Sequence, residues 1–180
     1  MTGTPSSQAV LVRRATPADL PAVGRLGALL VRTHHTFDET RFIAATRHTE
    51  VGYASFLGTQ LGERDVVVLV AEQDGQVIGY TYAGVEEQDW MSLRGRAGVL
   101  HDIVVDPERR RNGVGQMLLD STIALLKSLG APQVVLWTAE LNEPAQRLFA
   151  SAGFRRTMVE MTRDLDDVAR QVTSPRRVRR

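Results

Sequence analysis

The fold of this chain is best indicated by residues 99–119, which read VLHDIVVDPERRRNGVGQMLL. The first half is rich in β-branched residues and favours a half-buried strand, which Pro107 prevents from continuing inside a sheet. Two glycines, Gly113 and Gly115, then precede an apolar run at helical spacing. Backbone amides and the N-terminus of the helix therefore point at one turn, an arrangement suited to a phosphorylated ligand.

Positive charge is concentrated in the same turn, at Arg109, Arg110 and Arg111. An arginine can hold a phosphate through two donors at once. The run Arg-Arg-Arg-Asn-Gly is equally typical of a solvated turn that caps a helix, so charge alone does not decide between the two interpretations. Two common phosphate motifs are excluded, because Gly115 is not followed by Lys-Ser/Thr and Leu118 stands where a Rossmann turn needs its third glycine.

The remaining pattern, Arg110-x-x-Gly113-x-Gly115, resembles the Gln/Arg-x-x-Gly-x-Gly/Ala motif of the GCN5-related N-acetyltransferase (GNAT) superfamily. In that family the motif binds the pyrophosphate of acetyl-coenzyme A. A second block, residues 142–154, is similar to the family's Asn-x-x-Ala-x-x-Leu-Tyr-x-x-x-Gly-Phe helix. One departure is Phe149, which replaces the family's tyrosine acid, because a phenyl ring cannot donate a proton to a departing thiolate.

The pattern of elements along the chain fits the same family. The resemblance implies an α/β (α+β) GNAT fold, whose mixed, mostly antiparallel sheet has about six or seven strands, splays between the fourth and fifth, and is flanked by about four helices. Local patterns predict helices that start at Thr16 and Pro17, near residues 52–61, at 113–129 and at 143–152. The predicted strands are 10–14, 66–72, 77–85, 100–105 and 133–138, followed by a last strand or tight pair at 154–164.

Composition points to one ordinary domain, and the resemblance implies an enzyme that uses no metal. The 180 residues carry a formal net charge of +1 and include no cysteine, which excludes disulfides, thiolate metal sites and a cysteine acyl-enzyme. We expect a disordered N-terminus at residues 1–9, an acetyltransferase domain at 10–166, and a basic, disordered tail at 167–180. With no signal-like or membrane-spanning run, a cytoplasmic monomer or homodimer is expected, and nucleic-acid binding by the tail is a minor alternative.

The resemblance also assigns residues to acetyl-coenzyme A, the expected cosubstrate. In the family, the pantetheine arm adds like a short strand along the fourth strand, and the following turn holds the pyrophosphate. The positions of this chain that match the coenzyme-binding positions are Ile103, Val104, Val105, Arg110, Arg111, Asn112, Gly113, Val114, Gly115, Gln116, Asn142, Ala145 and Phe149. For the strand residues, a place in an ordinary core strand is an equally good interpretation.

The implied reaction is the direct transfer of an acetyl group to a primary amine of a small molecule or peptide, in a ternary complex. His101 is the leading candidate for the general base, since its unperturbed pKa suits proton transfer near neutrality. Asp102 is the second candidate, and the two side chains share one side of a strand only if the strand contains a bulge. The acceptor is expected to bind residues 34–60, and it remains unidentified. The alternative function is a catalytically weak coenzyme-binding module that acts through protein partners.

Overall fold

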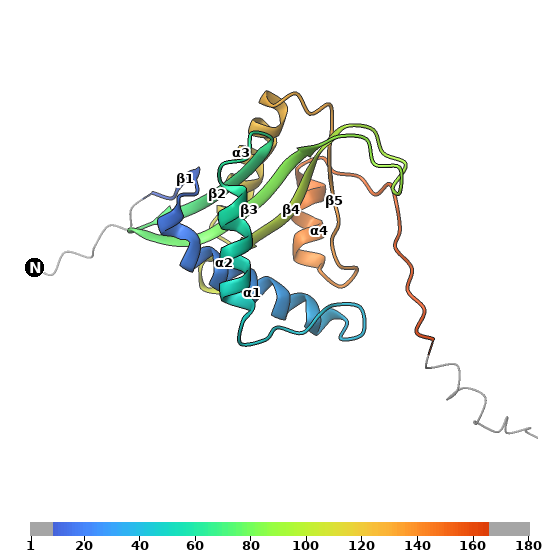
Figure 1. Cartoon of the computed structure of the whole chain (residues 1–180), viewed down its shortest axis with the longest axis horizontal. Coiled ribbons are helices and arrows are strands. Elements are labelled where there is room, and N and C mark those ends of the chain that lie inside the picture. Colours follow the sequence, from blue (N-terminus) through green and yellow to red (C-terminus); the bar gives the residue numbers. More distant parts are fainter. Residues whose placement is uncertain (1–8, 166–180) are drawn as a thin grey trace, which may run out of the picture.

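The computed structural model describes residues 9–165, and one sheet runs through their centre (Figure 1). Its strands are β1 (Leu11–Arg14), β2 (Val66–Gln73), β3 (Gln76–Glu86), β4 (Ala97–Val105) and β5 (Val134–Leu136). The helices are α1 (Leu20–Phe37), α2 (Thr49–Gln60), α3 (Val114–Ser128) and α4 (Glu143–Ser151), with single 3₁₀ turns at η1 (Pro17–Asp19) and η2 (Pro107–Arg109). Residues 1–8 and 166–180, which hold most of the predicted N-terminal segment and all of the predicted tail, lie outside the described residues.

The sheet has the mixed order that the sequence predicts. The strands lie in the order β1-β2-β3-β4-β5, with antiparallel pairs up to β4 and a parallel pair between β4 and β5. Asp74 and Gly75 form the β2–β3 turn, and both have positive φ, as the two central residues of a type I′ turn require. The predicted GNAT-type sheet is confirmed in its topology.

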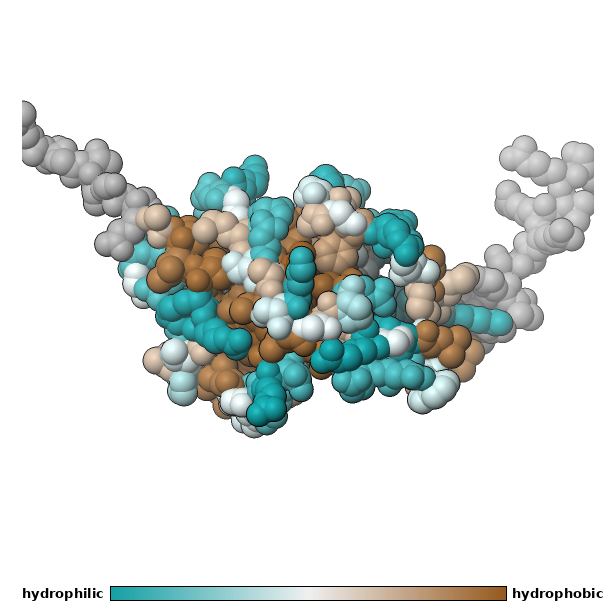
Figure 2. Space-filling model, turned by 90° about the horizontal axis from the view of Figure 1, so that it is seen from above, coloured by the Kyte–Doolittle hydropathy of each residue, from teal (hydrophilic) through white to brown (hydrophobic). Residues whose placement is uncertain are grey.

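The predicted last strand at residues 154–164 is wrong, so among residues 9–165 the sheet has five strands rather than six or seven. After α4, this segment is extended and almost entirely exposed, and Met158, Val159 and Met161 reach the surface. Hydrophobic residues lie among hydrophilic ones over the face of the molecule seen in Figure 2. Polar contacts hold it instead of a sheet, since Arg156 donates to Gln146 and Glu160 pairs with Arg41. A segment with strand-forming residues becomes a strand only where it can pair with the edge of a sheet. The neighbouring strand β5 is only three residues long and provides little edge for pairing.

Helices cover both faces of the sheet (Figure 1). On one face, α3 and α4 pack against β2, β3 and β4, where Leu118, Leu119 and Phe149 are buried. On the other face, α1 and α2 pack a second cluster that includes Leu57, Tyr80 and Val104. The carboxyl-terminal half of β4 therefore lies between the two hydrophobic clusters, one on each face of the sheet. No helix among residues 9–165 is long and apolar enough to cross a membrane.

The contact between α1 and α2 depends on a glycine. A Cβ atom added to Gly27 would overlap the ring of Tyr53, which leaves no room for a methyl group there. We therefore expect Gly27→Ala to lower the free energy of unfolding by about 1–3 kcal/mol, as overpacking does. Urea denaturation measures this, and Gly52→Ala on α2 is the matched control, because a Cβ at Gly52 meets no atom within 4 Å. Equal stability of the two variants would contradict the prediction.

Candidate active site

Strand β4 contains a bulge at His101. Tyr82 of β3 pairs with Asp102, whereas the next residue, Ala83, pairs with Leu100, so His101 is the extra residue. A bulge changes the direction of side chains on the bulged strand. Both candidate bases consequently reach the face covered by α1 and α2: the His101 ring stacks on Tyr82 with centroids 4.8 Å apart, and Asp102 contacts the buried tyrosine of that face.

Asp102 is a buried carboxylate held by two tyrosines. Its Oδ2 atom accepts hydrogen bonds from the Tyr53 hydroxyl at 3.0 Å and from the Tyr80 hydroxyl at 2.9 Å. Burial raises the pKa of Asp102, and the two donated hydrogen bonds oppose this rise. Burial and the neighbouring carboxylate raise the pKa of both tyrosines, so their hydroxyls stay protonated and keep donating. This cluster provides a fixed negative group directly beneath the His101 bulge.

Removing one tyrosine hydroxyl should destabilise the protein in a pH-dependent way. Tyr80→Phe leaves the buried Asp102 carboxylate with one donor, which we expect to lower the free energy of unfolding by about 1–3 kcal/mol at neutral pH. The folded-state pKa of Asp102 is already raised, and it rises further in the variant. The loss should therefore shrink as the pH falls and Asp102 becomes protonated. Denaturation of both proteins across acidic and neutral pH checks this, and a pH-independent loss would contradict it.

His101 is partly exposed and has one close polar partner. Its Nε2 atom lies 3.0 Å from Oε1 of Glu86, at the end of β3. Around it, Tyr82 also makes an edge contact with Phe56 of α2, at 5.6 Å between ring centroids. The histidine, two aromatic rings and two carboxyl groups thus form one polar and aromatic surface. Trp90 lies outside this group and is 77% exposed in the β3–β4 loop.

The sheet opens beside this surface. β4 pairs with β5 only at Gly98, Val99 and Leu100. From residue 101 to 105, β4 pairs with β3 alone among the described residues, so one edge of its backbone has no strand partner. The predicted splay between the fourth and fifth strands is confirmed. Val104 is buried in the α1–α2 cluster, whereas Ile103 and Val105 pack against the α3–α4 cluster, so the backbone is the part of this edge that can receive a ligand.

The turn before α3 presents free backbone donors. Among residues 9–165, no group accepts from the amides of Val114, Gly115 and Gln116, and the amide of Met117 is the first to bond within the helix, to the Gly113 carbonyl at 3.0 Å. These amides lie at the positive end of the helix dipole. The turn therefore offers the anion-binding geometry that the sequence predicts, through its backbone.

The side chains of the turn before α3 differ in their contacts: some are hydrogen-bonded within the protein and others are exposed. Arg110 folds back, and its Nε donates to the Val105 carbonyl at 3.0 Å, while Gln116 donates to Asp120. Arg111 and Asn112 are exposed, and Arg111 has a φ of +65°. Arg111 is exposed in a left-handed conformation, whereas Arg110 ties the turn to the end of β4.

The two glycines of the turn have separate roles. Gly113 has a φ of +77°, and a Cβ placed on it would meet no atom within 4 Å. A Cβ on Gly115 would instead lie 3.4 Å from Leu148 and 3.8 Å from Val105, inside the contact between α3, α4 and β4. The sequence suggests that both glycines open the backbone to a ligand. In the structure, Gly113 has open space beside it and Gly115 faces the packed interior, and their role toward a ligand stays a prediction.

The second motif of the sequence, residues 142–154, forms α4 and the turn after it, and its residues contact other parts of the protein. The Asn142 side chain caps the helix by accepting from the Ala145 amide at 3.3 Å. Phe149 is 6% exposed and makes an edge contact with Phe154, at 5.8 Å between ring centroids. Ala145 packs against the same cluster. A direct role of Asn142, Ala145 and Phe149 toward coenzyme A stays a prediction.

Two surface cavities lie elsewhere. One, of about 150 Å³, borders the β3–β4 loop, and another, of about 540 Å³, lies between the start of α1, the β2–β3 turn and η2. Neither is lined by His101 or Asp102.

The sequence alone does not single out Tyr80, a partner of Asp102, because its position in an apolar strand indicates only that it is buried. No group of three or more His, Asp or Glu side chains in residues 9–165 is arranged to hold a metal ion.

Known proteins share this architecture. A mycothiol acetyltransferase from Thermobispora bispora is 36% identical over 92 residues, which are 51% of this chain and 31% of that protein. A solved structure of a tetramutant of the BH1408 protein from Bacillus halodurans has a TM-score of 0.74 at 21% identity and covers 86% of this chain and 99% of that one. An aminoglycoside N-acetyltransferase, AAC(6')-Iy, solved in complex with CoA, has a TM-score of 0.68 at 18% identity, with coverages of 90% and 99%.

At these identities the solved structures establish a shared fold, and the chain spans about a third of the mycothiol acetyltransferase. The model of the acetyltransferase (GNAT) family matches residues 30–154, which include α2, the whole of β2 to β5, and α3 and α4. The match takes in the bulge, the open edge of β4 and the turn before α3. Because it covers more than half of the chain, this protein belongs to the acetyltransferase (GNAT) family.

Proposed function

We propose that this protein transfers the acetyl group of acetyl-coenzyme A to a primary amine of a small molecule or peptide. The observation that carries the proposal is the order of three features along residues 101–116. The free amides of Val114 to Gln116 lie at one end, the open edge of β4 follows, and the His101 bulge lies at the other end. The diphosphate, the pantetheine arm and the thioester of the cosubstrate follow one another in the same order. Relatives named as acetyltransferases support the reaction class.

The residues present fit this cosubstrate in two independent respects. The amides of Val114, Gly115 and Gln116 at the start of α3 have no acceptor among residues 9–165, and a helix N-terminus of this kind favours an anion. Residues 103–105 pair with β3 on one side, and the edge that faces away from β3 can take an amide-containing pantetheine arm by β-augmentation. Arg111 is exposed beside the amides and adds positive charge where a diphosphate would bind. Coenzyme binding in this scheme depends mainly on backbone groups.

The chemical step is direct attack of the amine nitrogen on the thioester carbonyl. The new C–N bond forms, the C–S bond breaks, and coenzyme A leaves as its thiolate, which takes a proton from water. The acylated nitrogen loses its second proton to the hydroxide that this leaves, which restores water. The amine must first be neutral, which costs about 4.6 kcal/mol at pH 7 for a lysine-like amine of pKa about 10.4, and only about 1 kcal/mol for an α-amine. His101 accepts the amine proton, because it is the accessible base on the bulge beside the open edge.

Buried Asp102 has a supporting role in this scheme. Both of its tyrosine partners donate to Oδ2, and its carboxylate lies next to the position where His101 becomes cationic after taking the proton. A negative group in that position stabilises the imidazolium. Phe149 cannot replace the family's acid because it carries no proton and is packed against Phe154. The same absence of an acid is the observation that favours the alternative, a catalytically weak coenzyme-binding module.

A thiol-release assay with acetyl-coenzyme A tests the proposal against a panel of small amines, peptides and aminoglycosides. Aminoglycosides are included because a structural neighbour is named for them. Turnover with any acceptor above the acceptor-free rate supports transferase function. Binding of coenzyme A by calorimetry without turnover across the panel would favour the binding module. Failure to bind coenzyme A would overturn both.

A further inference from the structure

Three aromatic rings lie in contact next to the bulge of β4. The His101 ring stacks on Tyr82 of β3, with centroids 4.8 Å apart, and Tyr82 makes an edge contact with Phe56 of α2 at 5.6 Å. Because both rings touch Tyr82, the centroids of His101 and Phe56 cannot lie farther apart than these two distances taken together. A small molecule of moderate length can therefore contact both rings.

Phe56 is exposed on a helix whose other side packs into the core. It is 49% exposed, whereas Leu57, the next residue, is fully buried in the α1–α2 cluster. Helix α2 also holds the Tyr82 ring, because Gln60, one turn after Phe56, accepts from the Tyr82 hydroxyl at 3.4 Å. The phenyl ring of Phe56 thus has a fixed neighbour on one side and solvent elsewhere. Covering such a ring with an apolar group is favourable.

The negative charge of this surface lies at its His101 end. Oε1 of Glu86 is 3.0 Å from Nε2 of His101, and the buried Asp102 follows His101 on β4. Burial raises the pKa of Tyr82, and the charges of Asp102 and Glu86 raise it further, so both carboxylates act on the ring between His101 and Phe56. An ammonium group is attracted to this end, whereas Phe56 itself offers apolar contact. The surface therefore favours an acceptor with its amine at His101 and an apolar group at Phe56.

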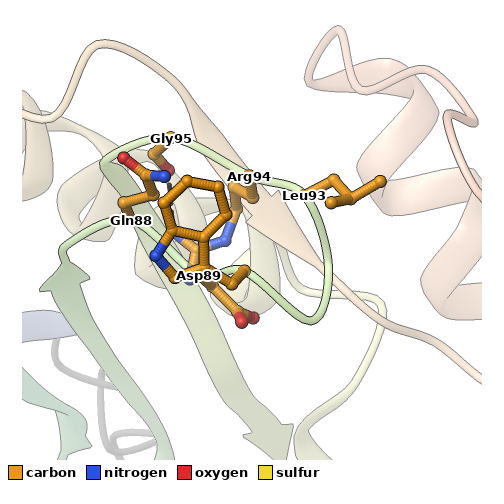
Figure 3. A pocket seen from close by; sticks show the side chains of 6 residues that line it. Gln88, Asp89, Leu93, Arg94 and Gly95 are labelled. Carbon is orange, nitrogen blue, oxygen red and sulfur yellow. Dashed lines mark hydrogen bonds between the residues drawn. The ribbon is translucent and has the colours of Figure 1, made fainter.

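The cavity beside the β3–β4 loop is a second place with room for part of an acceptor. It has a volume of about 150 Å³ and is lined by Gln88, Asp89, Trp90, Leu93, Arg94 and Gly95 (Figure 3). An ion pair stands between it and His101, since Glu86 lies beside His101 and accepts from Nη2 of Arg94 at 2.7 Å. Covering a charged pair with an apolar group carries a desolvation cost. The apolar part of an acceptor is consequently directed to Phe56.

We propose that Phe56 determines acceptor specificity, and that the preferred acceptor is an amine whose nitrogen is joined by a short linker to an aromatic or other apolar group. The inference rests on the proposed function, which places the reacting amine beside His101. The apolar group packs on the exposed part of the Phe56 ring, next to Tyr82. Amines of equal basicity without such a group, and polyhydroxylated amines, lose this contact and are poorer acceptors.

The test compares phenylalanine amide with alanine amide, α-amines of similar basicity that differ by one phenyl group. The wild type should acetylate phenylalanine amide with a kcat/KM about tenfold higher or more, as expected for one well-packed apolar group. Phe56→Ala should reduce this ratio to about twofold or less, and Phe56→Leu should keep most of it. A merely structural role of Phe56 would slow both acceptors alike and leave the ratio unchanged. Val51→Ala, which removes a 72% exposed apolar side chain from the same helix, is the matched control and should preserve the ratio.

Binding is measured alongside turnover, by titrating each amide into the protein with coenzyme A present. Phenylalanine amide should bind about fivefold more tightly than alanine amide in the wild type, and Phe56→Ala should remove the difference. A ratio near one in the wild type, or a ratio that Phe56→Ala leaves unchanged, would overturn the inference. If the difference in binding depends on Phe56 but no amine of the whole panel is acetylated, the inference holds and the proposed function fails.

Discussion

His101→Ala should lower kcat about 10²–10⁴-fold with an acceptor that binds as an ammonium, which is the usual contribution of a general base. The imidazole is the accessible base on the β4 bulge, and the variant removes it without leaving a buried charge unpaired. Binding of coenzyme A should persist, because the proposed coenzyme contacts are made by other residues. Steady-state kinetics over a range of pH, with calorimetry of coenzyme A binding, measure both expectations.

An exposed residue outside the proposed site provides the control. Lys127→Ala removes an exposed side chain in the last turn of α3 and should leave the rate unchanged. If His101→Ala keeps the wild-type kcat and pH profile, His101 is not the base. Asp102→Asn would then become the variant of interest, with its folding checked first, because Asp102 accepts two buried tyrosine hydrogen bonds.

Gly113→Asp should weaken coenzyme A binding about 10–100-fold relative to Gly113→Asn. Asn and Asp both tolerate the left-handed conformation that the φ of +77° requires, so the pair isolates the added negative charge. Two like charges about 6 Å apart repel by about 3 kcal/mol at an effective dielectric constant of about 20, and salt reduces this. Calorimetric titration with coenzyme A at low and moderate salt measures the difference, which should narrow as salt rises.

The second glycine supplies the contrasting case. Gly115→Ala adds a Cβ that makes ordinary contacts with Leu148 and Val105 and does not cover the free amides. Its affinity for coenzyme A should stay close to that of the wild type. Equal affinities of Gly113→Asp and Gly113→Asn would show that no diphosphate binds beside this turn. A large loss in Gly115→Ala with retained folding would show that the ligand approaches from the other side of α3.

Local patterns predicted most of the fold because each depends on residues that are close in sequence. The Asp74-Gly75 turn, the glycine before α3 and the glycine after α4 set the ends of their elements, and the observed bounds follow the predicted ones within a few residues. The turn before α3 likewise combines a strand end, a glycine with positive φ and a helix start in one short run. Its free amides result from the geometry of any helix N-terminus.

The last strand and the catalytic surface could not be predicted in the same way. The residues at 154–164 have a strand-like pattern, but strand formation needs a partner edge, and the three-residue β5 provides little of one. The bulge at His101 arises because β4 has one more residue than β3 at this point, and the sequence of either strand alone does not show this. The sequence therefore predicts His101 and Asp102 on opposite faces unless the strand contains a bulge, and the structure contains that bulge.

By itself, the sequence determined the family, the order of the elements and the glycine-containing turn before α3, because these features are encoded in short runs of neighbouring residues. Only the tertiary structure decided how the candidate site is assembled. It joins Tyr53 and Tyr80 to Asp102, and Arg94 to Glu86 and His101. These contacts bring together residues from α2, β3, the β3–β4 loop and β4, and their distances follow from strand register and helix packing, which no local pattern specifies.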